Sequence, residues 1–294
     1  MLALTMNMSR VYMLASDHRW QWEEWCDAAS VPRSRISEIK RLVLEAYLRA
    51  RHRADDVRRH GALLLDHKYG SESIARAKAA GVPVGSPVEK AGVFPLEWER
   101  TPFHAGADGS SFVKVLIRYR PEWPQSDGDR QMAKLLELQA WCRGNAVPLL
   151  VEIIIVRNGE DERDFEERGR PALLASVIHD AYARGLVPAI WKIEGTSSTA
   201  GARVIDAAIC EMSGPRQLIL GKGADAAAIA GWFDAAAGLP SPAGFAIGRS
   251  VFMEPATAYL KGLATDDEAV ETIATRYLGL IEAWKARELA ARMS

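Results

Sequence analysis

Short apolar runs alternate along this chain with longer segments in which apolar residues recur every three or four positions. The short runs are typical of buried strands, and the longer spacing is typical of amphipathic helices. The pattern predicts eight strands, at 11–16, 62–66, 82–88, 112–118, 148–156, 188–193, 216–221 and 244–249. It predicts helices at 34–52, 71–80, 127–143, 171–184, 199–212 and 224–237, and a final amphipathic helix at 266–294.

Strands that alternate with helices imply a parallel sheet, and eight such units over this length predict a (β/α)8 TIM barrel formed by a single domain, 1–294. A doubly wound open sheet is the alternative fold. Ser34 and Ser71 are the expected N-caps of the first two helices. The segment 90–111, rich in glycine and proline, is expected to be irregular, and the charge run at 157–169 to be a solvated loop or helix face.

Composition narrows the class of protein. Lys and Arg number 37 against 38 Asp and Glu, so the net charge of -1 predicts neither a nucleic-acid partner nor a membrane surface. Cys26, Cys142 and Cys210 are widely spaced and form neither a metal motif nor a disulfide framework, which suits a reducing cytoplasm. The N-terminal residues MLALTMNMSR are too few to span a membrane and lack the charged start of a signal peptide. We therefore expect a cytoplasmic protein without a metal or other cofactor.

Charged residues recur where the predicted strands end, and in a barrel these ends form the site. A single case has a structural explanation: Lys114 could extend its ammonium to solvent, and Glu152 could be its salt-bridge partner. The whole set favours a functional site, because unpaired buried charges cost several kcal/mol each. The residues are Asp17, His18, Arg19, Asp66, Glu89, Lys90, Lys114, Arg118, Glu152, Lys192, Glu194, Lys222 and Arg249.

The stretch VPAIWKIEG holds the strongest candidate for catalysis. Alternation along a strand places Lys192 and Glu194 on one wall, with Trp191 and Ile193 on the other. Desolvation favours the neutral amine of a buried lysine, and a neutral amine attacks carbonyls to form a Schiff base. The alternative is a buried Lys/Glu ion pair that only supports the fold.

The neighbouring charges suggest roles in such chemistry. Lys114 on a nearby inward face would favour the neutral form of Lys192 by like-charge repulsion. Glu152 lies between the two lysine strands in barrel order and is the expected proton shuttle. Asp17 is a second candidate for this role, or holds substrate hydroxyl groups.

The last two strands predict a phosphate site. LILGKGAD and AIGRSVF place Gly221, Lys222 and Gly223, and Gly248 and Arg249, at strand ends ahead of helices. Free backbone N–H groups and the helix dipole attract an anion there, and an arginine adds a bidentate partner. Other expected substrate-binding residues are Arg19, Glu89, Lys90, Arg118 and Glu194.

The segments YMLASDHR, LLLDHKYG, PVEKAG, FVKVLIRY, LVEIIIV, WKIEG, LILGKG and GFAIGRSVF together resemble a bacterial aldolase domain. That domain, the 2-deoxy-5-keto-D-gluconate 6-phosphate aldolase of myo-inositol catabolism, is often fused behind a sugar kinase. The resemblance extends from about residue 11 to residue 284. More distantly, the chain is similar to class I tagatose-1,6-bisphosphate and sulfofructose phosphate aldolases.

The resemblance implies a reaction and assigns residues to it. The KxE that supplies the Schiff-base lysine in those aldolases corresponds to Lys192, and their other site residues correspond to Lys114, Glu152 and Arg249. The implied reaction cleaves 6-phospho-5-dehydro-2-deoxy-D-gluconate to dihydroxyacetone phosphate and malonate semialdehyde. No kinase segment accompanies the matching residues, so the inositol pathway is less firmly implied than the chemistry.

Other functions stay open at this point. Tagatose 1,6-bisphosphate, sulfofructose phosphate or a deoxyribose-type phosphate would need a different cation at the far end of the substrate, with His18, Arg19, Lys90 and Arg118 available. A barrel that binds a sugar phosphate without turnover is a further alternative. We also expect a homo-oligomer. Three tryptophans after the first strand, Trp20, Trp22 and Trp25, could line an interface, pack under a helix or border the substrate mouth.

Overall fold

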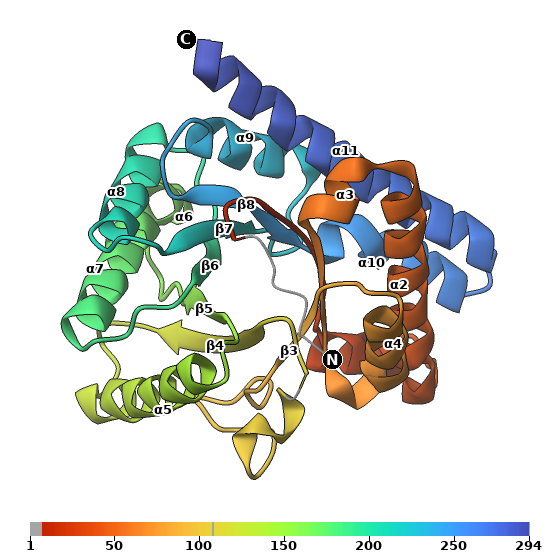
Figure 1. Cartoon of the computed structure of the whole chain (residues 1–294), viewed down its shortest axis with the longest axis horizontal. Helices are drawn as coiled ribbons and strands as arrows, with labels where there is room; N and C mark the ends of the chain where they lie inside the picture. The colour runs from red at the N-terminus through yellow and green to blue at the C-terminus, as the bar shows by residue number, and fades with distance from the viewer. Residues whose placement is uncertain (1–7, 108, 294) are drawn as a thin grey trace.

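The computed structural model describes residues 8–107 and 109–293 and contains a closed barrel of eight parallel strands in sequence order (Figure 1). The first strand pairs with both the second and the eighth, which confirms the predicted (β/α)8 barrel and excludes the open sheet. The strands are β1 (Val11–Ser16), β2 (Gly61–Leu65), β3 (Val84–Pro87), β4 (Val113–Tyr119), β5 (Leu149–Ile155), β6 (Ile190–Glu194), β7 (Arg216–Leu220) and β8 (Pro242–Ile247).

Helices surround the barrel on its outer face (Figure 1). They are α1 (Trp20–Ala28), α2 (Ile36–Arg53), α3 (Asp55–His60), α4 (His67–Ala79), α5 (Gln125–Gly144), α6 (Glu162–Asp164), α7 (Arg170–Ala183), α8 (Thr199–Cys210), α9 (Ala226–Ala236), α10 (Arg249–Leu260) and α11 (Asp266–Met293). Short turns of other helix types are η1 (Arg33–Arg35), η2 (Phe103–Gly106) and η3 (Phe165–Gly169).

The apolar strand residues are buried on both faces of the barrel wall, as expected for a parallel sheet covered by helices. Outward residues pack under the helices in two large clusters, and inward residues fill the barrel interior. Phe112 occupies the interior beside Gly85, where a Cβ would lie 2.4 Å from the Phe112 ring. The interior is therefore a packed core below the site, as is usual for this fold.

The structure corrects several predicted details. Ser34 and Ser71 are not N-caps: α2 follows η1 directly, and α4 begins earlier, where Asp66 accepts a hydrogen bond from the Tyr69 backbone N–H. The pattern also missed α1, α3 and α10. The connection after β3 is irregular as predicted, and among its described residues the turn η2 is the one helical element. Within the charge run at 157–169, Asp161 caps the short helix α6.

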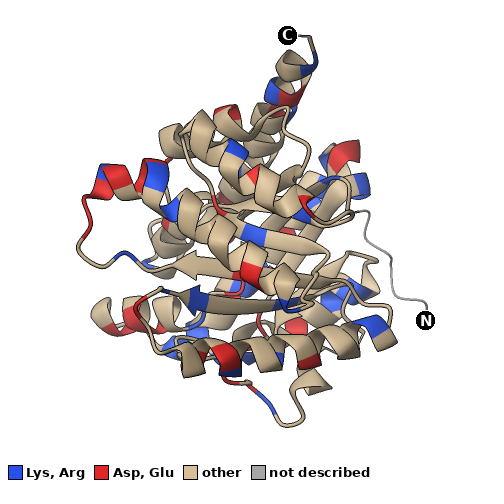
Figure 2. Cartoon of the chain, turned by 90° about the vertical axis from the view of Figure 1, so that its left-hand side faces the viewer, with Lys and Arg blue, Asp and Glu red and all other residues tan. Residues whose placement is uncertain are grey.

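The long final helix packs against the barrel and is not a separate unit. Along it, α11 contacts α2 and α10, and the Tyr277 hydroxyl donates a 2.6 Å hydrogen bond to the carbonyl of Tyr12 on β1. Figure 2 shows basic and acidic residues mixed over the outer helices on the face it presents. Among the described residues, no helix is both long and apolar enough to cross a membrane.

Candidate active site

The site lies directly above the packed interior, at the carboxyl ends of the strands. Phe112, Leu150 and Ile190 belong to the interior apolar cluster. Two residues further along the same three strands stand Lys114, Glu152 and Lys192, and all three are at least 94% buried and line one pocket. Because side chains at i and i+2 share a face, the alternation that builds the core also places a layer of charge on top of it.

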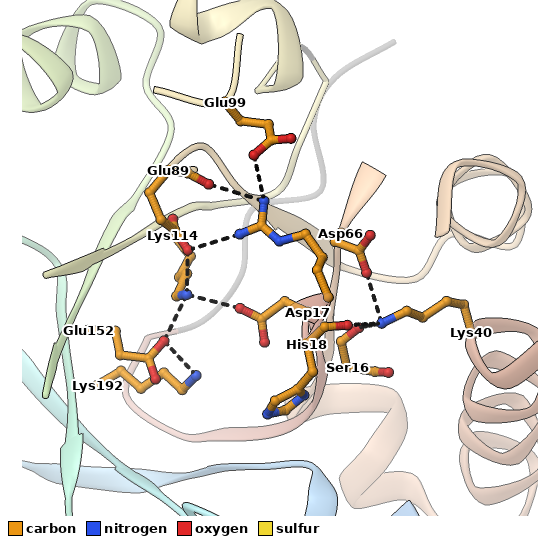
Figure 3. A network of polar contacts seen from close by, with 11 residues as sticks. Ser16, Asp17, His18, Lys40, Asp66, Glu89, Glu99, Lys114, Glu152 and Lys192 are labelled. Atoms are coloured by element: carbon orange, nitrogen blue, oxygen red, sulfur yellow. Dashed lines mark hydrogen bonds and ion pairs between the residues drawn. The ribbon is translucent and has the colours of Figure 1, made fainter. Parts of the chain in front are cut away.

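Lys114 is the centre of this layer (Figure 3). Its Nζ lies 2.9 Å from Asp17 Oδ2, 2.8 Å from Glu89 Oε1 and 2.9 Å from Glu152 Oε2. Asp17 and Glu89 follow the ends of β1 and β3, and Glu152 lies in the middle of β5, so the ammonium contacts carboxylates from three segments that are far apart in the sequence. Lys114 is only 2% exposed, so water contributes little to its solvation. The three carboxylates supply the stabilisation that a buried cation needs.

Lys192 is joined to this cluster through Glu152. The two residues are Cα partners in the pairing of β5 with β6, which brings Lys192 Nζ to 2.9 Å from Glu152 Oε2. The same oxygen contacts Lys114, so Glu152 bridges two lysines. In the described part of the chain, this is the one carboxylate that pairs with Lys192, whereas Lys114 has three. Of the two lysines, Lys192 therefore has the fewer carboxylate contacts.

The pKa values of the cluster favour charged forms at Asp17 and Lys114. Burial alone would raise the pKa of Asp17, but the charges of Lys114 and Lys192 outweigh it and hold the value well below its usual range. Burial would lower the pKa of Lys114, but Asp17, Glu152 and Glu89 hold it above its usual range. The pair is therefore ionised at neutral pH.

The pKa values of two neighbouring residues, Glu89 and His18, shift so that the neutral form is favoured. Burial raises the pKa of Glu89, despite the cations Lys114 and Arg19 beside it. Burial also lowers the pKa of His18 to about 3, with Asp17 opposing the shift and Arg249 adding to it. His18 is consequently a neutral imidazole near pH 7.

Arg19 connects the cluster to the loop after β3. Its guanidinium donates to the Glu89 carbonyl at 3.1 Å and pairs with the carboxylates of Glu89 at 3.4 Å and Glu99 at 3.2 Å. Arg19 lines the pocket, but these contacts engage both terminal nitrogens of its guanidinium and leave only Nε without a hydrogen-bond partner among the described residues. In Figure 3, Glu89 and Glu99 lie on the side of the cluster away from Lys192.

The ends of β7 and β8 form the opposite side of the pocket. Gly221, Lys222 and Gly223 follow β7, and Gly248 precedes α10, which begins at Arg249. Lys222 has a φ of 48° and Gly223 a φ of 81°, so this loop turns through the left-handed region. Arg249 donates to the Lys222 carbonyl at 3.0 Å, and its Nε is buried without a hydrogen-bond partner. The first N–H groups of α10 also lack helical partners, as in any helix.

Two residues of the predicted set, Glu194 and Asp66, lie outside the pocket lining. Strand alternation places Glu194 on the wall of Lys192, but its carboxylate pairs with Lys222 Nζ at 2.5 Å and lies 3.7 Å from Arg170 Nε. The other predicted site residues line a single pocket of about 430 Å³. They are Asp17, Arg19, Glu89, Lys90, Lys114, Arg118, Glu152, Lys192, Gly221, Lys222, Gly223, Gly248 and Arg249.

Sequence reasoning missed further parts of the site. Arg157, two residues after β5, lines the pocket; its place immediately after the predicted strand 148–156 was the signal, but it is also the first residue of the charge run at 157–169, which obscured it. Trp20 borders the mouth, whereas Trp22 is buried against Phe252. Asp66 does not line the pocket, because it is paired with Lys40. In the described residues, no group of three or more His, Cys, Asp or Glu side chains is arranged to hold a metal ion.

Fold and site together define a (β/α)8 barrel with a polar pocket of a size suited to a small ligand. The chain belongs to the family described as "Uncharacterized protein conserved in bacteria (DUF2090)", whose model matches residues 3–288. No curated protein matches it.

Similar solved structures share this fold at low sequence identity. Fructose-bisphosphate aldolase from Plasmodium falciparum is 13% identical, with a TM-score of 0.66 over 97% of this chain and 91% of that one. An archaeal fructose-1,6-bisphosphate aldolase, with its catalytic Lys covalently bound to the carbinolamine intermediate of the substrate, is 16% identical, with a TM-score of 0.57 over 95% of this chain and 96% of that one. The fructose-bisphosphate aldolase from Slackia heliotrinireducens is 13% identical, with a TM-score of 0.54 over 91% and 86%.

Proposed function

We propose that this protein is a class I aldolase that cleaves a phosphorylated keto sugar acid through a Schiff base on Lys192. The observation that supports it best is the placement of Lys192 Nζ at the floor of the polar pocket, 2.9 Å from Glu152. The similarity in fold to aldolases, one of them trapped with its lysine bound to a carbinolamine, agrees with this proposal.

The reaction needs an unprotonated amine, and the cluster indicates which lysine provides it. Lys114 is held as an ammonium by three carboxylates, so Lys192 is the lysine available to transfer its proton, with Glu152 as the acceptor. The neutral amine attacks the substrate ketone, and loss of water from the carbinolamine gives an iminium ion. Glu152, with Asp17 as the second candidate, then exchanges protons with the substrate.

Cleavage follows from the charge of the iminium ion. A base takes the proton of the substrate hydroxyl group, that oxygen forms the aldehyde carbonyl, and the carbon–carbon bond breaks toward the iminium carbon to leave an enamine. Protonation of the enamine carbon and addition of water release dihydroxyacetone phosphate and restore the lysine. Lys114 stays cationic in this scheme and stabilises the developing oxyanion.

The glycine loops after β7 and β8, with Arg249, are proposed to bind the phosphate. The specific substrate we propose is 6-phospho-5-dehydro-2-deoxy-D-gluconate, with malonate semialdehyde as the second product. The motifs that resemble the inositol-pathway aldolase support it. Tagatose 1,6-bisphosphate and sulfofructose phosphate would use the same Schiff-base chemistry and differ at the end remote from this phosphate.

Borohydride trapping with dihydroxyacetone phosphate tests the proposal. We expect the wild-type protein to give a reduced adduct on the peptide that contains Lys192, and Lys192→Met to give none and to lose turnover while remaining folded. Lys261→Met, which removes an exposed lysine outside the pocket, is the matched control and should be trapped like the wild type. Absence of an adduct from the wild type, or an adduct on Lys114, would overturn the assignment.

A further inference from the structure

The lining of the pocket carries more positive charge than one phosphate requires. Eight lysines and arginines face three acidic side chains there. Five of the eight already have a carboxylate partner: Lys114, Lys192 and Arg19 pair with the site carboxylates, Lys222 pairs with Glu194, and Arg157 lies 3.9 Å from Glu162. The members of the lining are Arg19, Lys90, Lys114, Arg118, Arg157, Lys192, Lys222 and Arg249, with Asp17, Glu89 and Glu152.

Two arginines without a carboxylate partner stand on opposite sides of the barrel. In the described ranges 8–107 and 109–293, no ion pair involves Arg118 on β4 or Arg249 at the start of α10 after β8. In a closed barrel of eight strands in sequence order, β4 and β8 are four strands apart in either direction. An elongated ligand with a negative group at each end would therefore span the mouth above Lys192.

The path from the lysines to Arg118 is apolar. Lys114, Leu116 and Arg118 share the inward face of β4, and Arg118 stands roughly 13 Å beyond Lys114 along the strand at about 3.3 Å per residue. Leu116 and Ile154 line the pocket between them, and Ile154 is the Cα partner of Arg118. The side chains of Leu116 and Ile154 cannot form a hydrogen bond with a hydroxyl group, so this part of the pocket fits a methylene group of the substrate.

The donors on the β4 side suit a carboxylate better than a phosphate. A guanidinium forms two parallel hydrogen bonds with the two oxygens of a carboxylate. The backbone donors that a phosphate uses at β7 and β8, glycine turns and a helix N-terminus, have no counterpart beside Arg118 in the described chain, because α5 begins only at Gln125. Arg157, after β5, stands at the same rim; it donates to the Glu160 carbonyl at 3.0 Å and pairs only at 3.9 Å with Glu162, so its positive charge is weakly compensated.

We propose that Arg118, assisted by Arg157, binds a carboxylate at the end of the substrate remote from the phosphate. With this arginine, the aldehyde proposed above, a short acid with a methylene between its carbonyl and its carboxylate, is expected to be preferred over an aldehyde with a second phosphate or a neutral sugar. The inference rests on the proposed aldolase function. Arg19, considered from the sequence for this role, is instead occupied by Glu89 and Glu99.

Condensation kinetics with dihydroxyacetone phosphate test this inference. The aldehydes are malonate semialdehyde, its neutral amide and glyceraldehyde 3-phosphate. We expect the wild type to prefer the acid over the amide in kcat/KM by about 10- to 100-fold, the range of a hydrogen bond between charged groups. Arg118→Gln should remove most of this preference, mainly through the KM of the aldehyde. Arg118→Lys should retain part of it, and Arg157→Gln should lose less.

Trapping of dihydroxyacetone phosphate on Lys192 separates the two proposals. This molecule has no second anion, so an adduct in Arg118→Gln shows that the variant is folded and forms the Schiff base. Arg143→Gln, which removes an exposed arginine of α5, is the matched control and should keep the preference. Three results, each with successful trapping, would show that this inference is wrong while the aldolase proposal stands. The preference for the acid could survive Arg118→Gln, it could disappear in Lys90→Met instead, or the wild type could have a higher kcat/KM for glyceraldehyde 3-phosphate than for malonate semialdehyde. Failure of the wild type to form an adduct overturns both.

Discussion

Asp17 and His18 are neighbours in the chain, and the pKa values of both are lowered. The lower pKa keeps Asp17 charged, whereas it keeps His18 neutral. Asp17 faces Lys114 and Lys192 and stays ionised. The ring of His18 packs edge-on against Phe252, with centroids 5.9 Å apart, and burial keeps it neutral. The residues directly after β1 thus provide an anion for the cluster, Asp17, and an uncharged part of the pocket lining, His18.

His18 should make the protein sensitive to mild acid. The unfolded chain takes up a proton at this residue near pH 6.5, but the folded protein does so only near pH 3. Since the unfolded state binds more protons in this window, stability falls as the pH drops from about 6.5, by at most about 1.4 kcal/mol per pH unit from this group. Thermal unfolding from pH 7 to pH 4 should show a smaller decline for His18→Asn than for wild type.

His52→Asn supplies the control, since His52 is exposed near the end of α2. Its decline should follow that of the wild type. An unchanged decline in His18→Asn would show that His18 does not govern this window. The depressed pKa of Asp17 acts in the same direction but at lower pH, because its contribution is lost only as its own carboxylate becomes protonated.

One buried lysine joins two strands and two helices beside the site. Lys40 of α2 pairs with Asp66 at 2.8 Å, and both side chains are fully buried. Its ammonium also donates to the carbonyls of Ser16 at 2.6 Å and His18 at 2.8 Å, and Asp66 caps α4. The contacts join the ends of β1 and β2 to α2 and α4 (Figure 3). They fix the backbone on both sides of Asp17.

Lys40→Met should destabilise the protein by about 3–5 kcal/mol, because it leaves the carboxylate of Asp66 buried without its cation. Urea unfolding measures this loss. Lys285→Met removes the same charge from a partly exposed pair with Asp56, and a loss below about 1 kcal/mol is expected there. Adding Asp66→Asn to Lys40→Met should restore part of the stability, since an Asn oxygen still caps α4. Equal losses in the two lysine variants would contradict this account.

In the whole molecule, the site lies at one end of the barrel axis, and residues that contribute mainly to stability lie at the other end. The pocket opens at the carboxyl ends of the strands, whereas α11 reaches the opposite end, where Trp284 lies beside Arg10 and Pro242 near the beginnings of β1 and β8. Trp284 is 1% exposed and packs against Phe233 of α9, with ring centroids 5.1 Å apart. In this fold, residues at that end contribute to stability.

Trp284→Ala should therefore lower the free energy of unfolding by about 3–5 kcal/mol, the range for removal of a large buried aromatic side chain. Trapping of dihydroxyacetone phosphate on Lys192 should be unaffected at temperatures where the variant is folded. Leu289→Ala, on the same helix but 62% exposed, should change stability by less than about 0.5 kcal/mol. Loss of trapping in folded Trp284→Ala would show that the two ends are coupled.

Local sequence patterns are sufficient to predict the barrel and the position of the charged layer along its strands. Apolar runs and helical spacing predicted all eight strands, because burial on both faces leaves a local signal. Alternation from Phe112, Leu150 and Ile190 to Lys114, Glu152 and Lys192 is also local, so three charged side chains of the site followed from strand parity alone. N-caps and short helices were missed, because several polar residues near each boundary could serve and packing selects among them.

Which charged residues form ion pairs became clear only from the tertiary structure. Lys114 and Asp17 are 97 residues apart and become partners only because the barrel closes. Glu194 obeys the same alternation as Lys192, yet Lys222 and Arg170 draw its carboxylate out of the pocket. Arg19 and Arg118 were equivalent candidates in the sequence, and the placement of Glu89 and Glu99 around Arg19 distinguishes them. Periodicity records whether a residue is buried, but pairing depends on distances between elements that no local pattern contains.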